Sequence, residues 1–326
     1  MTPENSFALI ALAAALCAAP ASQAQTPGGY PTRAIRLVVP FPAGGGADLA
    51  GRLVGQKLSE SMGQPVVVDN RAGASGAVGS DFVAKAAPDG YTILLGSATT
   101  HAVGPAVNSK LPYNNLTDFT AIALIATFPN MLVVNPAVPA RNVAEFIAYL
   151  RANPGKVNYA SSGAGSSLHL AAELFKMMTK TEMTHIPYKG SASLSNELLG
   201  GQVQCAIDNM TAVFPHVQSG KLRALGVASA ERVAAAPDVP TIAETLPGYE
   251  ASSWVGLFGP AGMPADIVAR IAADNRRAVF SPDVSQKMRD LGSVVVGSTP
   301  QEFAAFVRKD TDRWREVAKA ARITLD

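Results

Sequence analysis

Short apolar runs alternate with longer amphipathic segments along most of this chain. Residues 35–39 (Ile-Arg-Leu-Val-Val) are rich in β-branched side chains and predict a buried strand. Apolar residues then recur at helical spacing up to Gly63, which predicts an amphipathic helix that ends at this glycine. A glycine-rich turn lies between the two elements, in residues 39–48 (Val-Pro-Phe-Pro-Ala-Gly-Gly-Gly-Ala-Asp). Such a turn gathers unpaired backbone N–H groups at a helix start, where the helix dipole favours an anion.

A second segment repeats this order of elements. Residues 157–161 predict a strand, residues 162–165 (Ser-Gly-Ala-Gly) a turn, and residues 166–179 a helix with one apolar face. Because the two units lie about half a chain apart, we expect two α/β lobes that each direct a helix N-terminus at a shared cleft. Helix capping and ligand binding compete for the N–H groups near Ser162 and Ser166, and here we favour binding.

The remaining pattern continues the alternation of strands and helices. Further strands are predicted at residues 66–68, 92–95, 183–186, 202–207 and 224–228. Further helices are predicted at residues 77–87, 142–151, 265–279, 282–290 and 299–321, and between 190 and 200. Short connections of this kind imply largely parallel sheets, whose ligands bind beyond the carboxyl ends of the strands. Residues 128–130 predict a crossing into the second lobe and residues 231–253 a return, so we expect two crossovers.

Composition excludes several functional classes. The chain has 326 residues, 48% of them hydrophobic, which is enough for two domains with cores. The net charge is +2 and aromatic residues make up 6%, without a basic stripe, so nucleic acid is not expected as a partner. Residues 7–19 are apolar but too short to span a bilayer, and residues 22–24 (Ser-Gln-Ala) fit a cleavage site. We therefore expect residues 1–24 to be an export signal, although residues 1–6 lack the usual Lys or Arg.

The sequence offers no catalytic constellation. It contains no Gly-x-Ser-x-Gly elbow, no complete Gly-x-Gly-x-x-Gly and no P-loop. His169 and Glu173 lie one helical turn apart and form a metal-like pair, but no third ligand is evident, so packing or a capping contact is expected. Cys205 lies in a predicted strand and is expected to be a small core residue. We expect no catalytic residue, no metal and no cofactor.

An ordered set of motifs resembles one receptor family. The motifs are residues 39–48, 69–76 (Asp-Asn-Arg-Ala-Gly-Ala-Ser-Gly), 88–92 (Pro-Asp-Gly-Tyr-Thr), 159–169, 188–190 (Tyr-Lys-Gly), 199–203, 207–208, 254–257 and 260–264. Together they cover the mature chain, which resembles the Bug (Bordetella uptake gene) family, the TctC-like solute receptors of tripartite tricarboxylate transporters. The resemblance implies an α/β fold of the periplasmic binding protein type II-like class. That fold has two lobes with mainly parallel sheets flanked by helices, two hinge crossovers and a ligand in the interlobe cleft.

The resemblance also implies a binding site. The ligand is expected to be a small carboxylate held mainly by backbone amides, hydroxyl groups and ordered water. The implied ligand-binding residues are Phe41, Ala43, Gly44, Gly45, Ser97, Ala98, Ser162, Gly163, Gly165, Ser166 and Asp208. We hypothesise that Asp208 selects ligands with a hydrogen-bond donor distal to the carboxylate, with a buried structural role as the alternative. Asp48 is expected to cap its helix, because its charge would repel an anionic ligand.

The sequence also predicts where the lobes begin and end and which partners the protein has. Residues 25–128 and 251–326 are expected to form lobe 1, and residues 129–250 lobe 2. The protein is expected to be a periplasmic monomer that delivers its ligand to membrane permease subunits or presents the closed form to a sensor kinase domain. The alternative is an exported α/β enzyme that acts on a small organic acid, and a receptor fold used only in signalling is a third interpretation. Trp254 is expected to pack at the hinge or in the core.

Overall fold

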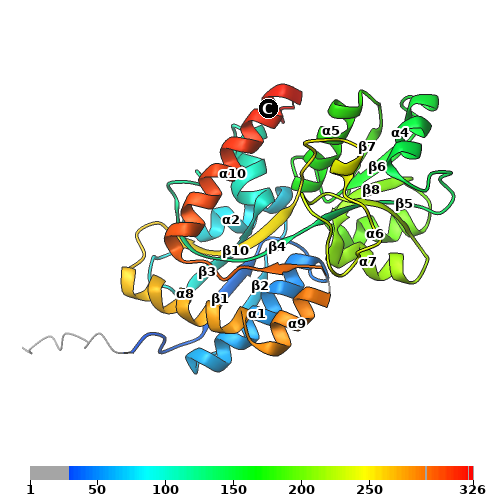
Figure 1. Cartoon of the computed structure of the whole chain (residues 1–326). Helices are drawn as coiled ribbons and strands as arrows, with labels where there is room; N and C mark the ends of the chain where they lie inside the picture. The colour runs from blue at the N-terminus through cyan, green and yellow to red at the C-terminus, as the bar shows by residue number, and fades with distance from the viewer. Residues whose placement is uncertain (1–28, 291, 322, 326) are drawn as a thin grey trace, which may run out of the picture.

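A computed structural model describes residues 29–290, 292–321 and 323–325, so the predicted export signal at residues 1–24 lies outside the described residues. The strands form two separate sheets, and helices flank both faces of each sheet (Figure 1). Each sheet organises one lobe. Among the residues that the structure describes, none of the helices has both the length and the apolar character needed to cross a bilayer.

The first lobe is built on a six-stranded sheet with the order β11-β4-β10-β3-β1-β2. Its strands are β1 (Ile35–Val39), β2 (Val66–Asn70), β3 (Thr92–Ser97), β4 (Phe119–Phe128), β10 (Ser253–Pro260) and β11 (Val294–Val295). One face packs on α1 (Gly46–Met62), α8 (Ala265–Val279) and α9 (Pro282–Asp290). The other face packs on α2 (Ala77–Ala84), α3 (Gly104–Val107) and α10 (Pro300–Ala321).

The second lobe is built on a five-stranded sheet with the order β7-β6-β8-β5-β9. Its strands are β5 (Asn130–Val134), β6 (Asn158–Ser161), β7 (Thr184–Pro187), β8 (Cys205–Asn209) and β9 (Arg223–Val227). The helices on its two faces are α4 (Val143–Ala152) with α5 (Ser167–Thr179), and α6 (Ser191–Leu199) with α7 (Met210–Gln218). Side chains along β5 alternate between these two cores, as the period of a strand requires.

Both sheets are mixed, although most strands run in one direction. β1, β2 and β3 are parallel to one another, as are β6, β7 and β8. β10 is antiparallel to both β3 and β4, and β5 is antiparallel to both β8 and β9. The reversal follows from the path of the chain, which enters the second lobe along β4 and returns to the first along β10.

The two crossings lie side by side and are tied together. β4 passes into β5 through Pro129, and the return segment reaches β10 after residue 251. Asn130 is 1% exposed, and its amide group donates to the carbonyl of Ala251 at 2.6 Å. The backbone N–H of Ala228 donates in turn to the carbonyl of Asn130 at 2.7 Å. Because both crossings share these bonds, they form a single pair of connected strands between the lobes.

The third strand is longer than predicted. The strand expected at residues 92–95 continues through Gly96 and Ser97 in β3, and Thr99–Val103 then form a π-helix that leads into α3. Asn115 and Thr311 hold this π-helix from outside by hydrogen bonds to the carbonyl of His101 at 2.7 and 3.0 Å. Such a helix is stabilised by distant residues rather than by a local pattern, and π-helical turns are frequent at functional sites.

Candidate ligand-binding site between the lobes

A partly open cavity of about 70 Å³ lies between the two lobes. The first lobe and the crossings contribute Phe41, Pro42, Ala43, Gly45, Gly46, Ala47, Ser97, Thr99, Phe128, Ser253 and Val255. The second lobe contributes Ser162, Ser167, Leu168, Lys189, Gly190, Ser191, Ala192, Asn209 and Thr211. Most of the polar side chains are hydroxyl groups, and Lys189 is the one charged side chain among these described lining residues.

Four helices begin at this cavity. Their first residues or caps are Gly46 in α1, Ser167 in α5, Ser191 in α6 and Asn209 before α7, and all four line the cavity. The caps of α1, α6 and α7 make no side-chain hydrogen bond to the helix. The first N–H groups of these helices have no intrahelical partner, and their dipoles add a positive potential in the cavity. The arrangement is suited to an anion.

Three polar atoms in the cavity wall lack a hydrogen-bond partner. They are Ser97 Oγ, Asn209 Oδ1 and Thr211 Oγ1, and Ser97 is only 5% exposed. Burying an unpaired polar group is unfavourable, and native proteins satisfy nearly all such groups. A ligand that hydrogen-bonds to these atoms would satisfy them. Their position therefore makes this cavity the candidate binding site.

A family profile described as a tripartite tricarboxylate transporter family receptor (TctC) matches residues 50–323 of the chain. The chain belongs to this receptor family. Protein BugT of Bordetella pertussis is 39% identical over 292 residues, which cover 89% of this chain and 90% of BugT. This confirms the resemblance to the Bug family.

Solved structures of related receptors share the whole fold. R. palustris Rpa4515 with adipate has a TM-score of 0.88 and 40% sequence identity, and the match covers 90% of this chain and 99% of that chain. MatC (Rpa3494) from Rhodopseudomonas palustris with bound malate has a TM-score of 0.85 and 34% identity, over 88% of this chain and 99% of that chain. The two-lobed periplasmic binding protein fold expected from the sequence is confirmed for this TctC receptor.

The structure separates the implied site residues into two groups. Phe41, Ala43, Gly45, Ser97 and Ser162 line the cavity of the receptor. The remaining residues are not among those that line it: Gly44, Ala98, Gly163, Gly165, Ser166 and Asp208. Sequence reasoning missed the start of α6 and the start of α7. A glycine before Ser191 and the Asn209 at a strand end were the available signals, and neither is specific on its own.

The first glycine turn of the receptor is fixed by Asp48. Gly45 is the N-cap of α1, and the carboxylate of Asp48 accepts a hydrogen bond from the Gly44 N–H at 3.0 Å. Asp48 also accepts from Arg52 at 3.0 Å and from Asn70 at 2.9 Å. Burial alone raises the pKa of Asp48, but these hydrogen bonds outweigh it and hold the pKa below its ordinary value. The expected capping role of Asp48 is therefore wrong: Gly45 is the N-cap, and Asp48 instead ties Gly44, which precedes the helix, to the first turn of α1.

The second glycine turn is capped from both lobes. Ser166 is the N-cap of α5, and its hydroxyl accepts from the N–H of His169 at 3.2 Å. The hydroxyl of Thr99, in the first lobe, accepts from the N–H of Ser167 at 3.1 Å. Ser75 of the first lobe donates to the carbonyl of Ala164 at 2.7 Å. These bonds cross the cleft, so the structure describes the closed arrangement of the lobes.

Asp208 lies behind the cavity wall. It is fully buried, and its Oδ1 atom accepts from the hydroxyl of Ser191 at 2.8 Å and from the N–H of Asn209 at 2.7 Å. Its Oδ2 atom has no hydrogen-bond partner. Burial raises the pKa of Asp208 to about 6 against the effect of these bonds. Both partners, Ser191 and Asn209, line the cavity, so Asp208 is linked to the site by hydrogen bonds to these two residues.

Other sequence expectations concern the core. Cys205 is buried, and its thiol lies 3.7 Å from the carbonyl oxygen of Asn158. Trp254 is 2% exposed, and its indole N–H donates to Asp310 at 2.7 Å, so it packs in the core beside the crossing. Within the described part of the chain, no group of three or more His, Cys, Asp or Glu side chains is placed to hold a metal ion.

Proposed function

We propose that this TctC receptor is a periplasmic protein that closes its two lobes over a small carboxylate. The convergence of four helix starts on one interlobe cavity carries this proposal. The cavity offers backbone N–H groups and hydroxyl groups to a carboxylate. Relatives with adipate and malate bound support the same ligand class.

The proposal includes export, lobe boundaries and partners. Residues 1–24 act as the export signal, residues 25–128 with 251–326 form lobe 1, and residues 129–250 form lobe 2. The hinge then runs through the paired crossings at Asn130 and Ala251. The receptor releases its ligand unchanged to membrane permease subunits or presents the closed form to a sensor kinase domain, and it has no catalytic activity.

A thermal-shift panel tests the ligand class with mono-, di- and tricarboxylates, adipate and malate among them, beside neutral and cationic compounds of similar size. We expect at least one carboxylate to raise the melting temperature of the mature protein, and mass spectrometry to recover it unchanged. A chemically altered ligand would favour the enzyme interpretation instead. A panel in which only neutral or cationic compounds bind would overturn the carboxylate assignment.

Two serine variants test the cavity itself. The hydroxyls of Ser97 and Ser195 are both buried without a hydrogen-bond partner, but Ser97 lines the cavity and Ser195 does not. Ser97→Ala should weaken binding of the best carboxylate about tenfold, because a ligand hydrogen bond is lost. Ser195→Ala is the matched control and should leave the dissociation constant unchanged. Equal effects in calorimetry would place the ligand elsewhere.

We propose that Asp208 selects the ligand indirectly, through Ser191. The hydroxyl hydrogen of Ser191 is donated to Asp208, so the oxygen of Ser191 can only accept a hydrogen bond from a ligand. This geometry favours a ligand with a hydroxyl or amino group away from the bound carboxylate. Ser191→Ala should therefore reduce the affinity for malate relative to succinate, which lacks the hydroxyl. An unchanged malate-to-succinate ratio would contradict this role.

A further inference from the structure

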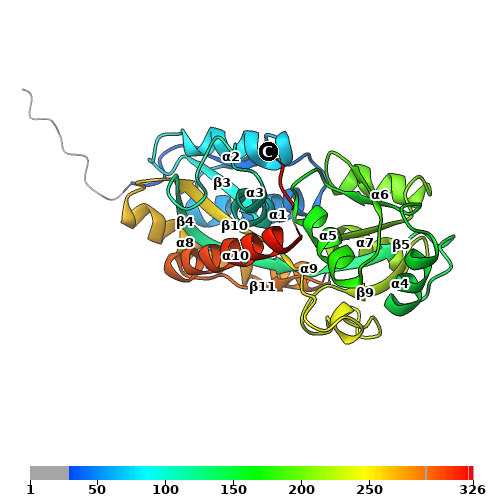
Figure 2. The same cartoon turned by 90° about the horizontal axis from the view of Figure 1, so that it is seen from above.

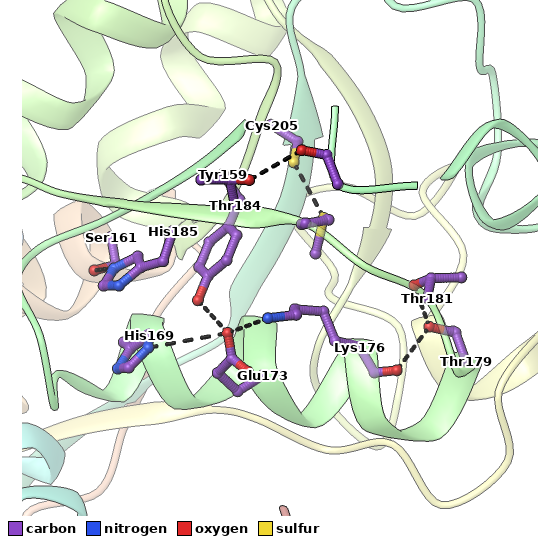
Figure 3. A network of polar contacts seen from close by, with 12 residues as sticks. Tyr159, Ser161, His169, Glu173, Lys176, Thr179, Thr181, Thr184, His185 and Cys205 are labelled. Carbon is purple, nitrogen blue, oxygen red and sulfur yellow. Dashed lines mark hydrogen bonds and ion pairs between the residues drawn. The ribbon is translucent and has the colours of Figure 1, made fainter. Parts of the chain in front are cut away.

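Three aromatic rings stack behind the second glycine turn, between α5 and the strands β6 and β7 (Figure 3). The ring centroids of His169 and His185 are 4.0 Å apart with an interplanar angle of 11°. The ring of Tyr159 continues the stack, 4.9 Å from His185. His169 is 8% exposed and His185 is half-buried, so water reaches the stack from one side.

Both histidines hold the turn by hydrogen bonds. The N–H of Gly165 donates to Nδ1 of His169 at 3.1 Å. Nε2 of His185 lies 2.6 Å from the hydroxyl of Ser161, and that hydroxyl also bonds to the carbonyl and the N–H of Gly163. Gly163 and Gly165 have φ angles of 134° and 71°, so the turn has a conformation that few other residues adopt. The two imidazoles therefore support the turn from behind.

The bond from Gly165 sets the protonation state of His169. Nδ1 accepts a hydrogen bond, so it carries a lone pair and the ring proton must reside on Nε2. Nε2 faces Oε1 of Glu173 at 4.0 Å. A second proton on the ring would have to sit on Nδ1, where it would face the N–H of Gly165. The turn and a protonated His169 are thus incompatible in this geometry.

The surrounding charges do not compensate a cationic ring. Oε1 of Glu173 is already held by Lys176 at 2.7 Å and by the hydroxyl of Tyr159 at 2.5 Å. Burial lowers the pKa of His169, Glu173 opposes this, and Lys176 adds to it. Burial and then the charge of His169 lower the pKa of His185 to about 4. The thiol of Cys205 on β8, beside Tyr159, is buried and its pKa is raised by burial.

We propose that His169, supported by its stacked partner His185, is a positioning residue that keeps the second glycine turn in its ligand-binding form only while the ring is neutral. The inference rests on the proposed receptor function, since it concerns the turn beside Ser162 and Ser167 in the cavity wall. It adds that ligand affinity falls as the surroundings of the receptor become acidic. Asp208 also titrates in this pH range and acts on the ligand through Ser191, so the effect assigned to His169 is the part of the pH dependence that a non-titrating residue at position 169 removes.

The sign of the effect follows from linkage. The closed form keeps the histidines neutral below their ordinary pKa of about 6.5. When the turn is loosened, the two histidines have pKa values closer to that ordinary value. Affinity is therefore complete above about pH 6.5 and is lost as the pH falls below that value, because the loosened form takes up more protons.

The first test needs no ligand. Nitrogen-15 NMR of the full mature chain reports the tautomer and the titration of each histidine, together with the Gly165 amide. We expect His169 as the Nε2–H tautomer at pH 7, with the Gly165 amide signal moving at the same midpoint as the His169 ring. A ring proton on Nδ1 at pH 7, or a Gly165 amide that does not follow His169, would overturn the proposal.

The second test uses variants, with adipate and malate as probes in calorimetry from pH 4.5 to 7.5. His169→Asn places an amide oxygen near the position of Nδ1 but cannot gain a proton. We expect this variant to bind nearly as wild type at pH 7.5. Between pH 7.5 and pH 4.5, the fold-increase of its dissociation constant should be at least ten times smaller than that of wild type. His169→Phe lacks the acceptor and should bind at least tenfold more weakly throughout, and it should raise the midpoint of His185.

The control is His216→Asn, which changes a histidine on α7 outside the cavity. It should keep the pH profile of wild type. A His169→Asn profile as steep as that of wild type would refute the role of His169. If neither adipate nor malate binds any form, the proposed ligand class is affected, while the NMR titration of Gly165 still decides this inference.

Discussion

Gly45 shows how a single residue separates folding from binding. Its backbone has φ −89° and ψ 172°, a conformation open to any residue, and a Cβ atom there would meet no atom within 4 Å. It also lines the cavity. We expect Gly45→Ala to leave the free energy of unfolding unchanged and to weaken carboxylate binding about tenfold or more, because the methyl group occupies ligand space. Chemical denaturation and calorimetry measure the two effects.

Gly63→Ala is the matched control for this change. Gly63 ends α1 with φ 70°, and a Cβ atom there also meets no atom within 4 Å. Its left-handed backbone makes alanine less stable by about 1 kcal/mol, far from the ligand. The expected pattern is thus reversed, with lower stability and normal affinity. A Gly45→Ala variant that binds normally would remove the first turn from the site.

Asp208 provides a pH-dependent prediction for stability. Its pKa of about 6 in the folded chain exceeds the ordinary value of 3.8, so the folded state carries the cost of a buried carboxylate above pH 6. Asp208→Asn should raise the free energy of unfolding at pH 7 by up to about 3 kcal/mol. The gain should shrink as the pH falls below about 6 and vanish below the ordinary value of 3.8, where the carboxyl group is protonated in both states.

Asp48→Asn serves as the opposite case in the same denaturation series. The pKa of Asp48 is lowered, so its charge stabilises the folded state near neutral pH and this contribution disappears in acid. Stability should therefore fall in this variant at pH 7. If Asp208→Asn also lost stability at pH 7, the cost assigned to the buried carboxylate of Asp208 would be wrong.

At the scale of elements, local patterns predicted most boundaries. β1 and α8 coincide with their predicted ranges, and Thr299 with Glu302 forms the predicted capping box of α10. The π-helix at Thr99–Val103 could not be predicted from local sequence. Its His101 carbonyl accepts hydrogen bonds from Asn115 and from Thr311, which lies 210 residues further along the chain. The helix starts at Ser191 and Asn209 enter the site only through the folding of the sheet.

The N-terminal capping of α5 can be tested with two serines of one turn. Ser166 caps the helix, whereas Ser162 lines the cavity. Ser166→Ala should lower the free energy of unfolding by about 1 kcal/mol, since the cap is lost. Ser162→Ala should leave stability unchanged and reduce the affinity for the carboxylate. Thermal denaturation that finds both variants equally destabilised would contradict this division of roles.

At the scale of the whole molecule, repeated strand-turn-helix units were sufficient to predict two lobes and a shared cleft. The same reasoning could not place Asp208, because the distance of a strand end from a cavity depends on how both lobes pack. One apolar cluster continues from the first lobe into the second, through residues such as Trp254, Tyr249 and Phe175. The lobes are thus joined by apolar packing on this side, while hydroxyl groups meet across the cleft.

Closure can be tested at Thr99. Thr99→Val has nearly the same shape but leaves the N–H of Ser167 unpaired in the closed form, whereas water satisfies it when the lobes open. We expect this substitution to shift the free energy of closure by about 1–3 kcal/mol in favour of the open form. Small-angle scattering at a fixed, subsaturating carboxylate concentration should then give a larger radius of gyration than for wild type.

Ser80→Ala is the control for Thr99→Val. Ser80 is fully buried, and its hydroxyl donates to Gly76 within the first lobe. Its loss should not change the compaction that the ligand induces. A Thr99→Val variant that closes as readily as the Ser80→Ala variant would show that the bond across the cleft does not hold the lobes together.

The position of β10 has a consequence for the order of folding. β10 lies between β3 and β4, yet it follows the entire second lobe in the chain, so the first sheet is incomplete until residues 253–260 arrive. The second sheet uses only β5 to β9, whose connections are local. Contacts between distant residues form slowly, because closing a long loop costs entropy. The inserted lobe can therefore complete its core first and hold the ends of β4 and β10 together at Asn130. This shortens the loop that must close when β10 joins the first sheet.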